Sequence, residues 1–370
     1  MHLPLTPTAL VLTPCIYTSE DTTGQLSPCP PTPSASSTWS LSLDTNSPLQ
    51  IIDGFGAAWT DATTYLFDFL PPDTTSSLLA DLFTSSGIQL EFVRTTIGQS
   101  DLTPEHDGRW SFDENDGEPD PDLTSWSLTE PGEHMLNHVK KMYDISPSIT
   151  LLGSIWSPPG WMIKGNVLNS SYTQAYVGYI TNHLKAYKSS GVELPLPSDF
   201  ETLFAFQKAN PGVKQYMTEC WLHDQSGEQF FDLPQFIMRP IQYGASGSLA
   251  WTLAGSVDLD VSYSGGCKEC TGIVQVDMNM GEFEKNHDWY ALGHFSKFVR
   301  KGARFLLIDG DYIYNDNTGV ESAGFINPNG SIIVDVMNKF SNDLEVTIKV
   351  DGSDVVQVLA AKSLTTFILN

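Results

Sequence analysis

Two kinds of residue in this sequence are suited to the chemistry of sugars: acids that follow hydrophobic strands, and tryptophans. The residues at or just past the predicted strand ends are Asp61, Arg94, Trp156, Glu219 and Trp251. Two carboxylates on an aromatic floor are the set that hydrolysis of a glycosidic bond requires. The sequence has no HExxH, Walker, GxSxG or dinucleotide-binding glycine pattern, so it does not indicate the chemistries that depend on them.

Each of these residues also has an ordinary structural explanation. Asp61 follows a turn and precedes a predicted helix, where aspartate is a favoured N-cap. Arg94 is equally well explained as a structural ion-pair partner, and Glu219 as a buried structural acid. Most aromatic side chains in a chain of this size belong to the core rather than to a ligand site.

The acidic composition disfavours several classes of partner. The chain has 44 Asp and Glu against 19 Lys and Arg, a formal net charge of −25. Such a surface repels nucleic acid backbones and anionic membranes, so a neutral substrate such as a glycan fits better. No apolar stretch approaches the roughly 18 residues of a transmembrane helix. Residues 9–12 are apolar but lack a basic n-region and a cleavage site, so no signal peptide is predicted.

The cysteines and histidines give no clear metal or disulfide pattern. Five cysteines do not describe a disulfide framework in a chain of this length. Cys267 and Cys270 form a CxxC that lacks a second ligand pair for zinc, which leaves a local disulfide or two free thiols. No metal site is predicted, because ligand spacing is absent among His106, His223, His287 and His294.

The elements that must position these residues alternate between strand and helix. Helical spacing occurs at 74–84, 133–143 and 172–188, and strands are predicted at 51–52, 89–93, 150–153 and 192–196. This alternation predicts a parallel α/β fold, of which the (β/α)8 barrel is the commonest closed form.

After Gly302 the chain changes to short β segments separated by Asp-Gly and Pro-Asn-Gly turns, a pattern typical of a small antiparallel sandwich. Residues 1–37, rich in Pro, Ser and Thr, are predicted to be a loose leader. The predicted domains are strands joining the sandwich at 38–50, a barrel at 51–300 and a β-sandwich at 301–370.

Four segments, taken in order, resemble the motifs of glycoside hydrolase family 30, the glucosylceramidase-like group. The likeness covers about residues 38–194 and 204–370. The motifs are Asp53-Gly-Phe-Gly-Ala-Ala-Trp-Thr-Asp61, Ser157-Pro-Pro-Gly-Trp-Met162, Tyr216-Met-Thr-Glu-Cys-Trp221 and Tyr290-Ala-Leu-Gly-His-Phe-Ser-Lys-Phe298. Any one of them alone is weak, whereas four in the family's order are specific.

The resemblance implies a retaining β-glycosidase that needs no cofactor and acts on a glycan or glycolipid, either a β-1,6-glucan or glucosylceramide. It also implies a location outside the cell, in the secretory pathway or in the lysosome. Glu219 would be the nucleophile, and Arg94 would lie beneath the carboxylates. The sugar pocket would be lined by Asp61, Trp156, Trp221 and Trp251.

The sequence departs from the family at the acid/base. The family carries this residue in an Asn-Glu-Pro motif on its fourth barrel strand, and that motif is absent here. Glu118 precedes the third-strand motif, and Glu193 would lie at the wrong end of strand four. Between Val192 and Lys214 the chain is too short for the rest of strand four, three helices and two further strands. We therefore predict a barrel truncated near 195–212, without its fifth and sixth strands and without an acid/base. The alternatives are a non-catalytic glycan-binding protein and an unstable truncated gene product.

Overall fold

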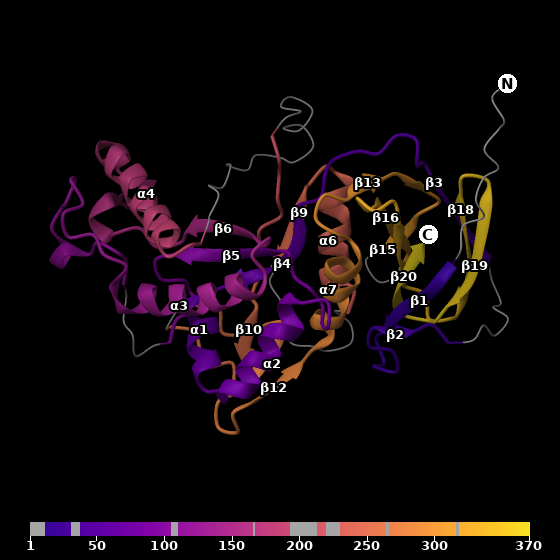
Figure 1. Cartoon of the computed structure of the whole chain (residues 1–370), viewed down its shortest axis with the longest axis horizontal. Coiled ribbons are helices and arrows are strands. Elements are labelled where there is room, and N and C mark those ends of the chain that lie inside the picture. The colour runs from indigo at the N-terminus through magenta and orange to yellow at the C-terminus, as the bar shows by residue number, and fades with distance from the viewer. Residues whose placement is uncertain are drawn as a thin grey trace.

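The structure is a computed structural model in which two regions lie side by side, one of strands and helices and one almost entirely of strands (Figure 1). Among the described residues no helix is long and apolar enough to cross a lipid bilayer. The description covers residues 12–30, 38–104, 110–165, 167–192, 213–219, 230–263, 266–315 and 318–370.

A parallel sheet forms the centre of the α/β region. β4 (Gly54–Trp59) lies between β5 (Phe92–Ile97) and β9 (Gly247–Ala250), and β6 (Thr150–Ile155) pairs with the far side of β5. β4, β5 and β6 are successive strands of the main sheet, each pair linked through helices, whereas β9 comes from much later in the chain. The pairing of β9 with β4 therefore joins the end of this region to its beginning, as barrel closure does.

The segment 213–219 extends this sheet beyond β9. The N–H of Met217 donates to the carbonyl of Gly247 at 3.0 Å, and the N–H of Leu249 donates to the carbonyl of Met217 at 2.8 Å. The bridge is parallel. On its outer side β6 pairs with no strand of the described chain.

Helices cover the outer face of this sheet (Figure 1). Each buries one apolar side, as α2 does with Leu78, Leu79, Leu82 and Phe83. The predicted helices at 74–84, 133–143 and 172–188 correspond to α2, α3 and α4. The helices are α1 (Asp61–Asp68), α2 (Pro72–Phe83), α3 (Thr129–Ile145), α4 (Thr173–Ser189), α6 (Asp232–Gln242) and α7 (His287–Phe298).

Smaller elements complete the α/β region. They are β10 (Ala254–Ser256), β11 (Val274–Asp277) and β12 (Glu282–Lys285) in one sheet, the hairpin β7 (Ile163–Lys164) and β8 (Val167–Leu168), and the 3-10 turns η2 (Asn115–Gly117), η3 (Gly160–Met162) and η4 (Ser170–Tyr172).

Side chains from the strands also form a small separate cluster. Phe92 of β5, Leu152 of β6 and Leu249 of β9 are buried together, with Tyr216 packed against them. The rings of Phe92 and Tyr216 lie edge to face, 5.0 Å apart. Because each comes from a different strand of one parallel sheet and stands apart from the main core, this cluster corresponds to the interior of a barrel.

The β region is a two-sheet sandwich. Its strands after the α/β region are β13 (Arg304–Leu306), β14 (Ile308–Asp309), β15 (Tyr312–Asn315), β16 (Thr318–Ile326), β17 (Ile332–Asn338), β18 (Leu344–Val350), β19 (Ser353–Leu359) and β20 (Ser363–Leu369). Three earlier strands join them: β1 (Leu12–Ser19), β2 (Ser27–Pro28) and β3 (Thr38–Leu43). β3 runs parallel to β18 and antiparallel to β14. The sheet orders are β13-β16-β17-β20-β1-β2, with β15 beside β16, and β14-β3-β18-β19.

The prediction of a loose leader over 1–37 is wrong for residues 12–30. β1 (Leu12–Ser19) pairs with β20, β2 (Ser27–Pro28) pairs with β1, and a disulfide joins Cys15 to Cys29. The partner of β1 is β20, at the far end of the chain, so the residues near β1 in the sequence do not predict this pairing. A second disulfide joins Cys267 to Cys270, which was one of the two open alternatives.

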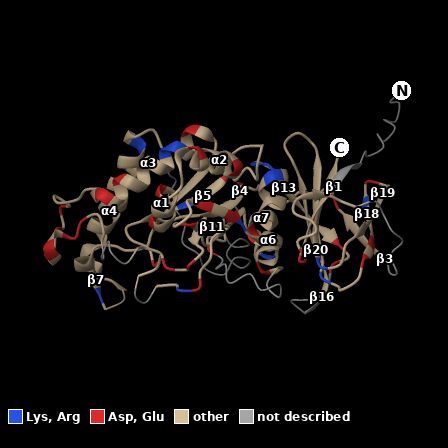
Figure 2. Cartoon of the chain, turned by 90° about the horizontal axis from the view of Figure 1, so that it is seen from below, with Lys and Arg blue, Asp and Glu red and all other residues tan. Residues whose placement is uncertain are grey.

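A buried charge cluster connects the two regions. Glu321 of β16 is fully buried and accepts hydrogen bonds from Arg239 of α6, at 3.1 Å from Nε and 3.0 Å from Nη2. Its other cationic partner is Lys339, which is also fully buried. Elsewhere acidic residues are scattered along the ribbon of both regions (Figure 2), and the sequence has more of them than of basic residues.

Candidate active site

The predicted nucleophile and the predicted arginine are in contact. Nη1 of Arg94, from β5, donates to Oε2 of Glu219 at 2.9 Å and to the carbonyl of Thr218 at 3.2 Å. Nη2 donates to the hydroxyl of Ser154 on β6 at 3.3 Å. The Arg94 side chain is 6% exposed and that of Glu219 is 27% exposed. A buried cation thus fixes the carboxylate while part of that carboxylate stays accessible.

Two of the three predicted tryptophans stack on each other beside this pair. The rings of Trp156 and Trp251 are 4.6 Å apart and inclined by 11°. The guanidinium carbon of Arg94 lies 4.9 Å from the Trp156 ring and 5.4 Å from the Trp251 ring. Trp251 is fully buried, whereas Trp156 lines a cavity. Trp251 therefore supports Trp156 from behind, and its direct contact with a sugar stays a prediction.

Asp61 is held in the interior at the start of α1. Its carboxylate accepts hydrogen bonds from the hydroxyl of Ser100 at 2.8 Å and from that of Thr103. The N-cap of α1 is Thr60, which accepts from the N–H of Thr63, so the capping explanation of Asp61 does not apply. Burial raises the pKa of Asp61 to about 7, against the lowering effect of both hydroxyls. Asp61 thus anchors the loop after β5, and a contact with sugar hydroxyls remains predicted.

The loop after β5 also carries Asp101, an acid that the sequence analysis did not name as a site residue. Burial raises its pKa, and so does the negative charge of Glu219, while a hydrogen bond from the backbone of Cys267 opposes the shift. Its Oδ1 is buried. The sequence pattern placed the end of the strand at Arg94, but β5 continues to Ile97. An acid just past this strand was therefore overlooked.

The cavity at this edge of the sheet has a volume of about 340 Å³. Trp156 forms part of its wall together with the loop after β5 and the turn after β6. Such a lining of aromatic faces with a few polar groups suits a sugar ring. Other lining residues are Trp110, Glu114, Pro158, Gly160 and Tyr263.

Two predictions fall outside the described residues. Trp221, a predicted pocket residue, lies in the segment 220–229, and the predicted truncation near 195–212 lies in the segment 193–212. Both remain predictions.

The sequence matches two family models in succession. The TIM-barrel domain of glycosyl hydrolase family 30 matches residues 52–200, and the beta sandwich domain of the same family matches residues 312–367. These two domains correspond to the α/β region and the β-sandwich of the structure.

Several relatives extend over nearly the whole chain. An endo-1,6-beta-D-glucanase of Neurospora crassa is 30% identical, covering 91% of this chain and 90% of the relative. The endo-1,6-beta-D-glucanase neg1 of Aspergillus fumigatus is also 30% identical, over 91% of this chain and 89% of its own length. A mouse lysosomal acid glucosylceramidase is 22% identical over 83% of this chain and 79% of that protein.

Solved structures share the fold at low identity. An endo-beta1,6-glucanase superposes with a TM-score of 0.81 and 18% identity, covering 98% of this chain and 99% of that one. SrfJ from Salmonella typhimurium gives a TM-score of 0.81 at 17% identity, over 97% and 99% of the two chains. Two domain models matched in order, and relatives 30% identical over 91% of the sequence, show that this chain belongs to glycoside hydrolase family 30, close to the endo-1,6-β-glucanases.

Proposed function

We propose that this chain is a retaining β-glycosidase for β-1,6-glucan in which Glu219 is the nucleophile and the usual acid/base is missing. The observation that carries the proposal is the contact between Glu219 and Arg94 next to Trp156. Glu219 would attack the anomeric carbon, the bond to the leaving oxygen would break, and a covalent glycosyl ester would form. Arg94 would keep the attacking carboxylate in place, and Trp156 would support the sugar.

The loss of the acid/base has two supports. The sequence contains no Asn-Glu-Pro. The alignment with the Neurospora relative also runs over 432 positions, more than the 370 residues of this chain, so the relative has residues for which this chain has none. Both agree with an internal segment that is shorter than in the family. We therefore expect impaired hydrolysis of natural glycans, whose alkoxide leaving groups need a proton.

The choice of β-1,6-glucan over glucosylceramide rests on sequence identity. The relatives named endo-1,6-glucanases are 30% identical over 91% of this chain, whereas the mouse glucosylceramidase is 22% identical over 83% of it. The two disulfides favour an oxidising compartment, so we propose an extracellular or secretory-pathway location.

The test separates the two chemical steps. A dinitrophenyl β-glucoside needs no general acid, so we expect a burst of dinitrophenolate equal to the amount of enzyme, followed by slow turnover. Azide needs no general base, so it should restore turnover and give the β-glucosyl azide. Glu219→Gln should abolish the burst.

The opposite outcomes are equally specific. Fast, azide-independent hydrolysis of β-1,6-glucan would show that another carboxylate, such as Asp101 or Glu201, serves as acid/base. A folded protein that binds the glucan but gives no burst would instead favour the glycan-binding alternative. A chain without a cooperative thermal transition would support the unstable gene product.

A further inference from the structure

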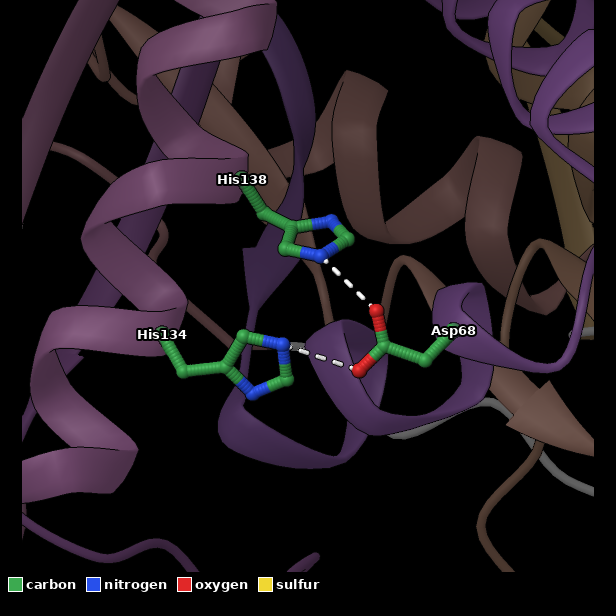
Figure 3. A group of neighbouring side chains, drawn as sticks. All are labelled: Asp68, His134 and His138. Atoms are coloured by element: carbon green, nitrogen blue, oxygen red, sulfur yellow. Dashed lines mark hydrogen bonds and ion pairs between the residues drawn. The ribbon is translucent and has the colours of Figure 1, made fainter.

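Three side chains with metal-binding atoms converge on the outer layer of helices (Figure 3). Asp68 is the last residue of α1, and His134 and His138 lie one turn apart on α3. Nε2 of His134 is 2.9 Å from Oδ2 of Asp68, and Nε2 of His138 is 3.0 Å from Oδ1. The three candidate ligand atoms lie within 4.8 Å of one another.

The spacing of the two histidines explains why both rings reach one carboxylate. Residues four apart on a helix share a face, and α3 presents this face to the end of α1. Histidines at i and i+4 with an acid from another element are a recurrent zinc ligand arrangement. The sequence-based prediction of no metal site considered only His106, His223, His287 and His294, which lack this spacing. It therefore missed His134 and His138.

We propose that Asp68, His134 and His138 bind a zinc ion that ties α1 to α3. Zinc accepts imidazole nitrogens at about 2.0–2.1 Å and carboxylate oxygens at about 2.0–2.2 Å, which places tetrahedral ligand atoms roughly 3.3 Å apart. The contacts of 2.9 and 3.0 Å reach different oxygens of Asp68, so the one that becomes a ligand pair would open by a few tenths of an ångström. The three ligand atoms, which lie within 4.8 Å of one another, would draw together around the ion. Two imidazoles select zinc and its transition-metal neighbours over calcium or magnesium, which prefer oxygen ligands.

The surroundings agree with such a site. The side chains of Asp68 and His134 are each 43% exposed, so an ion can enter and water can occupy the fourth position. The net charge of −25 draws cations to the protein.

The proposed ion is structural and independent of the glycosidase proposal. α1 begins at Asp61, next to the strand ends that form the candidate active site, and Asp68 lies at its other end, about 10 Å further along at 1.5 Å per residue. The ion would fasten the first helix of the α/β region to the third. Its binding should therefore raise thermal stability and leave the burst on a dinitrophenyl glucoside unchanged.

The experiment uses the full chain stripped with a chelator and titrated with zinc chloride in a calorimeter. We expect one zinc ion per chain and a higher thermal midpoint with zinc, whereas calcium and magnesium should have no effect. Asp68→Ala and His134→Ala, both at half-exposed positions, should each weaken binding at least tenfold. His287→Ala on α7 is the matched control and should bind as the unaltered chain does.

Cobalt gives a readout of coordination. Co²⁺ at this site should show the intense visible absorption of a tetrahedral complex, and His134→Ala should lose it. A folded, stripped chain that takes up no stoichiometric zinc would overturn the proposal. So would zinc binding that is unchanged in both Asp68→Ala and His134→Ala, since the ion would then be bound by other residues.

Discussion

Replacing Asp61 by asparagine should change how stability depends on pH. Burial raises the pKa of Asp61 from 3.8 to about 7, so the folded chain holds this proton over a range in which the unfolded chain has released it. The folded state binds more protons there, and stability consequently falls as pH rises from about 4 to about 7. Asparagine is nearly isosteric with the protonated acid and carries no charge at any pH.

The size of the effect follows from the two pKa values. A shift from 3.8 to about 7 costs about 4 kcal/mol once the group ionises in both states, at about 1.4 kcal/mol per pKa unit. Between pH 5 and pH 8 the stability of the unaltered chain should fall by ~2–3 kcal/mol because of this group. Asp61→Asn should lack this part of the fall, since the hydroxyls of Ser100 and Thr103 also contact backbone carbonyls and keep acceptors.

Urea unfolding at several pH values between 5 and 8 measures the difference directly. Asp122→Asn, on an exposed loop, is the control and should follow the unaltered chain throughout. Parallel stability curves for Asp61→Asn and the unaltered chain over this range would refute the reasoning. Buried His183 and His294, whose pKa values burial lowers to about 3, act in the opposite direction and destabilise the fold below about pH 6.5. Maximum stability is therefore expected at mildly acidic pH.

Three further predictions concern single contacts. Glu321→Gln should destabilise the fold by about 3–5 kcal/mol in denaturant unfolding, because it removes the carboxylate from buried Lys339, and replacing both residues by methionine should recover part of the loss. Alanine at Cys267 and Cys270 should raise KM for a dinitrophenyl β-glucoside more than it lowers the burst amplitude, since the backbone of Cys267 holds Asp101; unchanged KM would exclude that positioning role. Trp156→Ala should weaken glucan binding at least tenfold in calorimetry, with circular dichroism as the check on folding, and unaltered affinity would remove Trp156 from the proposed sugar site.

Several features could be predicted from the sequence because they depend on local chemistry. The spacing of leucines predicts α2, since a helix must bury one side. The short segments separated by turns predict the sandwich, because alternating residues face opposite sides of a strand. The candidate pair of Glu219 and Arg94 follows from their places at or near the carboxyl ends of parallel strands, which gather at one edge of a barrel.

Other features were decided by contacts between distant parts of the chain. β1 is a strand because β20, at the far end of the sequence, offers it free hydrogen-bonding groups. Trp251 lies behind Trp156 rather than in the cavity, since one ring of a stacked pair covers the other. Burial and the charge of Glu219 both raise the pKa of Asp101, which lies in the loop after β5 because that strand runs to Ile97, three residues past its predicted end. The sequence by itself determined which side chains are available for chemistry, and the tertiary structure decided which of them meet, because burial and distance depend on packing between segments that the sequence keeps apart.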